Sequence, residues 1–282
     1  SYETQYDSPH SYLFYAGAVR WGSWVFGAGY SNPFYNDYTY INPLSGIAIE
    51  RLEIGLKSYD AMIARRFGKY LAVGVAAHQE TTYQAYRNSS IPGSVAVGGI
   101  STKATATSYS FGMAIRDEAW GVGVSYFPER KIVVDKSGDD SLEAFNTVVF
   151  RDVVVPGKTS YGIFARPWER LLLAFDIDRY SMVSNAIYVS SVTTSYSWLK
   201  SEPFQIMHGG FELTALADKW WELLLRGGGY REPTRFQDGR DRDHITYGAE
   251  VRIGPLVYSY GADQAQGFNN SSHGLSFSLD GL

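Results

Sequence analysis

Apolar and polar side chains alternate one by one along most of this chain. Between residues 120 and 126, bulky apolar residues at the even positions alternate with two glycines and a serine. An alternation of period two is typical of a β-strand whose two faces meet different surroundings. One face is continuously apolar in several such runs, at 71–77, 109–115, 171–177 and 245–253. The pattern predicts an all-β fold.

Short turns and long polar connections alternate between these runs. The short turns are expected at 20–23, 67–69, 117–119, 167–170, 217–219 and 254–255. The long loops, rich in Gly, Asn, Ser and Pro, are expected at about 31–48, 87–102, 129–157, 182–203, 232–243 and 264–272. Membrane β-barrels of bacteria have this layout, with short turns in the periplasm and long loops outside the cell.

Tryptophan marks one end of the predicted strands. Six of the seven tryptophans lie beside the short turns: Trp21, Trp24, Trp120, Trp168, Trp220 and Trp221. Aromatic side chains at one end of many strands are typical of the girdle that a membrane barrel places among lipid headgroups. We therefore predict a transmembrane antiparallel β-barrel in the outer membrane of a Gram-negative bacterium, with membrane lipids around it.

The strand count comes from the turns. Six short turns join twelve strands, and 272–279 supplies a thirteenth. Since bacterial single-chain barrels have even numbers of strands, we expect about fourteen in one domain that spans residues 1–282. The missing strand would precede 12–20, either as its end at 2–6 or in a longer N-terminal part. The β-rich stretch 147–155 either extends the wall or pairs with 131–135 as a hairpin arm.

A soluble β-sandwich or propeller would show the same alternation. The apolar face would then point into a core, and the polar face into water. Periodicity alone does not separate these folds. The tryptophan placement and the rhythm of short turns and long loops favour the barrel.

Composition narrows the classes further. No apolar run approaches the ~18 residues of a membrane helix, and the mean hydropathy is -0.20. The chain has no cysteine, which excludes a disulfide scaffold and a thiolate metal site. A net charge of -4 gives no reason to expect nucleic acid as a partner.

The face opposite the apolar one carries charges of both signs. In a barrel these residues line the lumen, where ions need water or a partner. The near balance of signs suggests ion pairs across the lumen. The candidate lumen-lining residues are Arg51, Glu53, Lys57, His78, Glu80, Arg116, Asp176, Asp178, His208, Glu212, Arg226, Glu250 and Arg252.

The apolar positions change phase within 51–66. They are even-numbered up to Leu56 and odd-numbered from Tyr59 onward. A slip of one residue near Lys57 and Ser58 predicts a β-bulge or kink in this strand. Such a kink either shapes the wall or opens it.

The histidines do not form a recognisable catalytic motif. His78 with Glu80, and His208 with Glu212, could serve as a general base and its orienting acid. No serine lies in a nucleophile elbow, and no His, Asp or Glu spacing matches a metal motif. We therefore expect no enzyme activity, no metal and no cofactor.

A family resemblance begins at 24–38, which carries the pattern Gly27-x-Gly29-Tyr30-x-x-Pro33-Phe34. It continues through 63–67 and 69–75, through 161–167 with its Arg-Pro turn and 171–175, and through 209–212, 226–230 and 244–248. Over nearly the whole chain the sequence resembles the outer-membrane long-chain fatty acid transporter family (FadL/TodX-like). The resemblance implies a fourteen-stranded barrel that passes hydrophobic molecules inward. It also implies an N-terminal hatch, a lateral opening at a kinked strand and an extracellular groove.

The resemblance places the groove at Phe34, Tyr35, Tyr38, Tyr40 and Ile41, where an acyl chain or aromatic compound would bind. The sequence departs from the family in two respects. No hatch-like segment precedes Tyr12, and the C-terminal strand lacks a terminal aromatic residue. Two alternatives stay open: a general diffusion porin for small polar solutes, and a scaffold subunit of a secretion or adhesion complex with protein partners at the long loops.

Overall fold

The computed structural model describes residues 4–6, 14–41, 48–88, 100–133, 153–182, 202–234 and 240–277. All regular secondary structure in these ranges is β-strand. The same ranges contain no helix of the length and apolar character needed to cross a membrane. The all-β prediction is confirmed.

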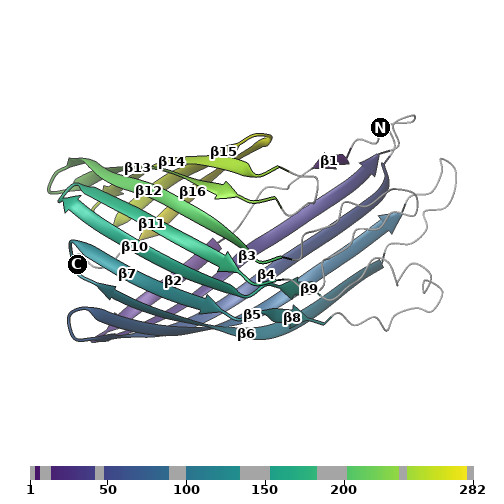
Figure 1. Ribbon diagram of the computed structural model, residues 1–282, viewed down its shortest axis with the longest axis horizontal. Helices are drawn as coiled ribbons and strands as arrows, with labels where there is room; N and C mark the ends of the chain where they lie inside the picture. Colours follow the sequence, from purple (N-terminus) through teal and green to yellow (C-terminus); the bar gives the residue numbers. More distant parts are fainter. Residues whose placement is uncertain are drawn as a thin grey trace.

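Long strands build the wall of the molecule (Figure 1). They are β2 (Phe14–Trp21), β3 (Trp24–Ile41), β4 (Ala48–Phe67), β5 (Leu71–Asn88), β6 (Ile100–Arg116), β7 (Trp120–Phe127), β10 (Lys158–Trp168), β11 (Leu171–Tyr180), β12 (Phe204–Ala217), β13 (Trp221–Glu232), β14 (Arg242–Ile253), β15 (Leu256–Ala265) and β16 (Phe268–Phe277). The three short strands are β1 (Thr4–Tyr6), β8 (Arg130–Ile132) and β9 (Val153–Val155).

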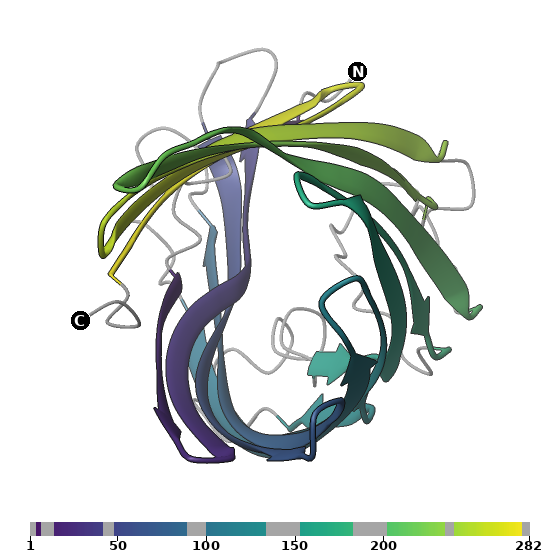
Figure 2. The ribbon, with the colours of Figure 1, turned by 90° about the vertical axis from the view of Figure 1, so that its left-hand side faces the viewer.

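The wall is one antiparallel sheet of 14 strands that curves into a barrel (Figure 2). Each long strand from β3 onward pairs with the next long strand along the chain. β1 and β2 pair with different parts of the same edge of β3, so the 14 strands fill thirteen positions. The thirteen strands counted from the turns are therefore confirmed, and the expected fourteenth has no counterpart among the described residues. Of the two possibilities for it, a strand that ends at residues 2–6 is wrong, because β1 continues the line of β2.

All six predicted short turns are confirmed, and they lie at one end of the barrel, which we call the turn end. The opposite end is the loop end. There, the predicted loop at 264–272 is wrong, because β15 and β16 pair directly up to Ala265 and Phe268. Gly267 has a φ of 73°, a conformation that allows a two-residue turn here.

The predicted loop at 31–48 is also too long, since β3 continues to Ile41. The central parts of five predicted loops, at 42–47, 89–99, 134–152, 183–201 and 235–239, lie outside the described residues.

The outer face of the wall carries an exposed apolar zone. Phe111 is 53% exposed and Ile163 57%, although both are large and apolar. From Ile245 to Ile253 the zone follows about 27 Å of strand at roughly 3.4 Å per residue, comparable to the ~25 Å apolar band of membrane barrels. The six predicted girdle tryptophans lie at its turn end. Exposed tyrosines lie at its loop end: Tyr59, Tyr109, Tyr126, Tyr161 and Tyr247.

Beyond the tyrosines, the polarity of the two faces reverses. On β4 the outer Lys57 is exposed, whereas the inner Leu56 and Ser58 are buried. The same outer level carries Lys103, Arg179, Gln205, Arg231 and Asp243, all exposed. Strands that leave the membrane meet water on their outer face, so polar side chains replace apolar ones there.

This reversal corrects the predicted kink at Lys57 and Ser58. β4 pairs with β5 from Glu50 to Phe67 without a break in register. The apolar phase changes because the surroundings change, not because the strand slips. Lys57 is therefore an outer residue, and its assignment to the lumen is wrong.

A bulge does lie at this level, but in β3. Between the pairs Ser31–Ser58 and Phe34–Leu56, β3 has two residues and β4 has one. One of the two is Pro33, which has no N–H to donate to the ladder, and proline is tolerated at bulges for this reason. The pattern change in β4 predicted the correct level of the bulge but the wrong strand.

The short strands β8 and β9 form a separate two-stranded sheet, which we call the arm. The arm lies within the ring of wall strands (Figure 2). Of the two possibilities for 147–155, the structure has the hairpin arm, with Val153–Val155 paired to Arg130–Ile132.

The space around two glycines allows a prediction about stability. A Cβ atom at Gly248 would lie 2.6 Å from the carbonyl oxygen of Tyr260, whereas one at Gly17 would meet nothing within 4 Å. Gly248→Ala should lower the free energy of unfolding by about 1–3 kcal/mol, because backbone has to shift. Gly17→Ala should stay within about 0.5 kcal/mol of the wild type. Denaturant unfolding in lipid vesicles, followed by tryptophan fluorescence, measures both. Equal stability of the two variants would contradict this packing.

Candidate functional site

A chain of polar and aromatic contacts runs around the inner face near the loop end. It begins on β4, where Ser58 donates a hydrogen bond of 2.6 Å to Asp60. The Nδ1 atom of His78 on β5 lies 2.7 Å from the Asp60 carboxylate. Its Nε2 atom lies 2.8 Å from the hydroxyl of Ser110 on β6. Both nitrogens of this imidazole therefore have partners.

The chain continues through β7, β10 and β11. The ring of Phe127 lies 5.8 Å from that of His78, and the Lys158 ammonium lies 5.2 Å from the centre of the Phe127 ring. Lys158 is also 3.5 Å from the carboxylate of Asp178, which accepts a hydrogen bond from Ser160. The Lys158 ammonium thus lies between the face of an aromatic ring and a carboxylate, and both groups attract a positive charge.

Aromatic stacking dominates from β12 to β15. The His208 ring lies 3.9 Å from Asp178 through Nε2 and 5.1 Å from the Tyr230 ring. Tyr230 stacks on His244 with ring centres 4.2 Å apart. Both of these residues bind Asp263: the Tyr230 hydroxyl donates to it over 2.6 Å, and His244 Nδ1 lies 2.8 Å away. The His244 side chain is only 2% exposed.

We call these contacts the inner belt. Strand register produces it, because directly paired residues of neighbouring strands have their side chains on the same face. Asp60 pairs with His78, Phe127 with Lys158, His208 with Tyr230, and Tyr230 with His244. The members of the belt are Asp60, His78, Phe127, Lys158, Asp178, His208, Tyr230, His244 and Asp263.

A second polar cluster, the turn-end network, covers the inner face of β12, β13 and β14. Arg226 lies 2.8 Å from both Glu212 and Glu250. Arg252 lies 2.7 Å from Glu250 and 3.1 Å from Glu222. The two guanidinium groups thus alternate with three carboxylates. These are contacts along one wall, not the ion pairs across the lumen that the sequence suggested.

The predicted lumen residues divide among these clusters. His78, Asp178 and His208 lie in the belt, and Glu212, Arg226, Glu250 and Arg252 lie in the turn-end network. Glu80 lies apart from both and pairs with Arg130 of the arm. Arg116 and Asp176 are at inner positions and make no ion pair within the described ranges. The side chains of Arg51 and Glu53 lie outside the described residues, although both belong to β4.

The predicted groove residues belong to β3 rather than to a loop. Phe34, Tyr35, Tyr38, Tyr40 and Ile41 all pair with β4, beyond the bulge. Their side chains lie outside the described residues, so the groove stays a prediction.

Six members of the belt were not predicted from the sequence: Asp60, Phe127, Lys158, Tyr230, His244 and Asp263. A signal for five of them was present, because each has the parity opposite to the apolar residues of its strand. Asp263 lies directly before the wrong loop at 264–272. Which of these residues lie at one level follows only from the register between strands.

The two histidine–glutamate pairs considered for catalysis are not brought together. His78 contacts Asp60 and Ser110, while Glu80 contacts Arg130 and Ser108. His208 lies near Asp178, and Glu212 pairs with Arg226. The described part of the chain also holds no group of three or more side chains suited to a metal ion. What the inner face offers is a hydrogen-bonding and aromatic surface.

The turn-end network yields a second prediction. Arg226→Met removes two ion pairs, which leaves Glu212 without a cation and Glu250 with Arg252 alone. The free energy of unfolding should fall by about 1–3 kcal/mol, and Glu212→Gln in the same chain should restore part of it. Arg231→Met is the matched control, since Arg231 is 63% exposed at its pair with Asp241, and it should cost less than about 1 kcal/mol. The urea unfolding midpoints of the single variant, the double variant and the control measure these differences. No recovery in the double variant would contradict the network.

Comparisons with known proteins find similarity in structure alone. No protein-family model matches the chain, and no curated protein matches its sequence. Among solved structures, a FadL homologue of Pseudomonas aeruginosa matches with a TM-score of 0.61 at 11% identity, over 89% of this chain and 69% of that one.

Two toluene transporters match similarly. TbuX of Ralstonia pickettii has a TM-score of 0.58 at 14% identity, over 89% of this chain and 75% of its own. TodX of Pseudomonas putida has a TM-score of 0.57 at 12% identity, over 93% and 78%. The chain therefore has the transmembrane β-barrel fold of the FadL- and TodX-like outer-membrane proteins.

Proposed function

We propose that this protein transports hydrophobic molecules across the outer membrane of a Gram-negative bacterium through its barrel. The observation that supports this most strongly is the shared fold, since two of the similar structures are toluene transporters. The exposed apolar zone between tryptophans and tyrosines supports the membrane location. Because membrane barrels have short turns in the periplasm and long loops outside the cell, the turn end would face the periplasm and the loop end would face outside.

The ligand would arrive at the loop end. We place its first contact on β3 beyond the bulge, at Phe34, Tyr35, Tyr38, Tyr40 and Ile41. From there it would pass the inner belt, where the partly exposed side chains of Phe127 and Tyr230 offer contacts to a ring or an acyl chain. Lipids of the membrane would surround the apolar zone, and protein partners, if the barrel has any, would meet the long loops.

A second candidate is a general diffusion porin for small polar solutes. The belt and the turn-end network favour it, because charged side chains of both signs line the inner face. A porin would hold a continuous water column and conduct ions steadily. A transporter of hydrophobic molecules would hold its ligand and conduct little.

Ligand retention and conductance separate these functions. Native mass spectrometry of the purified protein should detect a bound lipid or detergent-like molecule, because an apolar path binds such ligands during purification. In planar bilayers the same preparation should show little steady conductance. A large steady conductance with no bound ligand would overturn the proposal in favour of the porin.

Displacement of a fluorescent hydrophobic probe then tests the substrate class. N-phenyl-1-naphthylamine should bind the reconstituted protein with increased emission, and the true ligand class should displace it. Toluene and oleate are the two competitors to compare, with sucrose as the polar control. Displacement by sucrose alone would contradict a hydrophobic substrate.

A further inference from the structure

The arm is the one part of the described chain that leaves the wall and turns inward. Its two stems leave the wall at neighbouring points, since Phe127 of β7 pairs with Lys158 of β10. From there β8 approaches the inner side of β6, and Ile132 near its end is fully buried, with 0% exposure. Figure 2 shows both short strands inside the ring of the wall.

A buried ion pair fixes the arm to the inner face of β5, which is separated from β7 by β6 alone. Arg130 of β8 donates hydrogen bonds from Nε and Nη2 to the two carboxylate oxygens of Glu80 on β5. The Glu80 side chain is 2% exposed, and the hydroxyl of Ser108 donates a further bond of 3.3 Å to it. A bidentate pair of this kind is strong and directional. Without Arg130, Glu80 would be a buried carboxylate with no cation, which is costly.

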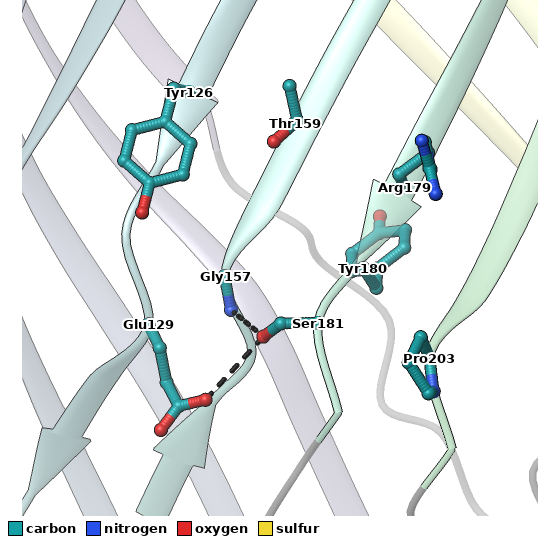
Figure 3. Close-up of a pocket in the computed structure, with 8 residues that line it drawn as sticks. All are labelled: Tyr126, Glu129, Gly157, Thr159, Arg179, Tyr180, Ser181 and Pro203. Carbon is teal, nitrogen blue, oxygen red and sulfur yellow. Dashed lines mark hydrogen bonds between the residues drawn. The ribbon is translucent and has the colours of Figure 1, made fainter.

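The base of the arm is held separately. Ser181, which follows β11, accepts a hydrogen bond of 2.9 Å from the Gly157 amide and lies 3.5 Å from Glu129 (Figure 3). The Ser181 amide donates to the Gly157 carbonyl over 2.8 Å. These bonds tie both stems to the end of β11, beside a pocket of about 360 Å³. The base is thus anchored without Arg130, so loss of the Glu80 contact would free the inner part of the arm and leave its stems attached.

We propose that the Arg130–Glu80 pair is a latch that holds the arm inside the lumen, where the arm forms a constriction at the loop end that excludes polar solutes. This inference rests on the proposed transport function and names the residues that determine selectivity within it. A barrel for hydrophobic molecules has to exclude water-soluble compounds, and the wall alone, with its polar inner belt, does not. The arm leaves the wall between β7 and β10 and lies inside the ring, against the inner faces of β6 and β5 (Figure 2).

Ion conductance measures the constriction directly. Arg130→Ala and Glu80→Gln should each raise single-channel conductance in potassium chloride several-fold, and they should admit larger sugars in liposome swelling. The charge-swapped chain, with Glu80→Arg and Arg130→Glu together, should return toward the wild-type value. Arg231→Ala is the matched control, because it breaks an exposed ion pair with Asp241 that touches neither the arm nor the turn-end network, and it should leave the size cut-off unchanged.

A cysteine label measures the latch independently of transport. Since the chain has no cysteine, Ile132→Cys provides a single reactive thiol. It should react slowly with a water-soluble maleimide in the otherwise wild-type chain, and several-fold faster when Arg130→Ala or Glu80→Gln is added. Heat-modifiable mobility in gels checks that each variant is a folded barrel.

The outcomes are distinct. Wild-type labelling in a folded Arg130→Ala chain would overturn the latch, and faster labelling with unchanged conductance would overturn the constriction. Failure of the charge swap to lower conductance would overturn the ion pair as its cause. None of these outcomes depends on ligand retention, so a failed transport proposal and a failed latch give different results.

Discussion

In the hydrocarbon of a membrane, a backbone N–H or C=O without a partner costs several kcal/mol, because no water is present to bind it. The strands of this protein meet that constraint by pairing with their neighbours. From β3 to β16 the ladder passes from each long strand to the next along the chain. The pairing then dictates the rest. Once register is fixed, alternate side chains go to lipid and to the lumen, and residues far apart in sequence come to one level.

The inner belt is the clearest consequence. Asp60 and Asp263 lie far apart in the chain, yet successive contacts across neighbouring strands connect them around the inner face. Most polar groups of the belt have a partner on a neighbouring strand, which lowers the cost of placing charges inside a barrel. The arm adds the only described charge pair that joins the wall to a segment inside it. In the proposed latch, selectivity depends on a contact between the arm and the wall strand β5, not on the wall alone.

The sequence predicted the features that depend on local pattern. The alternation in β6, β11 and β14, the six short turns and the tryptophans at the turn end all follow from residue spacing, and the structure has them. Predictions from residue spacing failed where one pattern can have two different causes. In β4 a change of phase at Lys57 resembled a bulge, but it marks the level at which the strand leaves the apolar zone. At Gln266 and Gly267, polar residues resembled a long loop, but a positive φ at one glycine makes a tight turn.

Contacts that depend on the register between strands could not be predicted from the sequence either. Nothing local indicates that Glu80 would meet Arg130 rather than His78, because that contact depends on where the arm enters the barrel. The same holds for Tyr230, His244 and Asp263, which share a level only through the pairing of three strands.

The central claim is that one face of each wall strand meets lipid and the other meets the aqueous lumen. Spin labels placed singly along β12 of the reconstituted protein test it most directly, at Met207, Phe211 and Leu213 on the outer face and at His208, Gly210 and Glu212 on the inner face. Collisions with oxygen, which concentrates in lipid, and with a water-soluble nickel chelate should alternate with period two and in opposite phase. High nickel accessibility at the outer positions, or low accessibility of these positions to both reagents as in the core of a sandwich, would contradict the barrel.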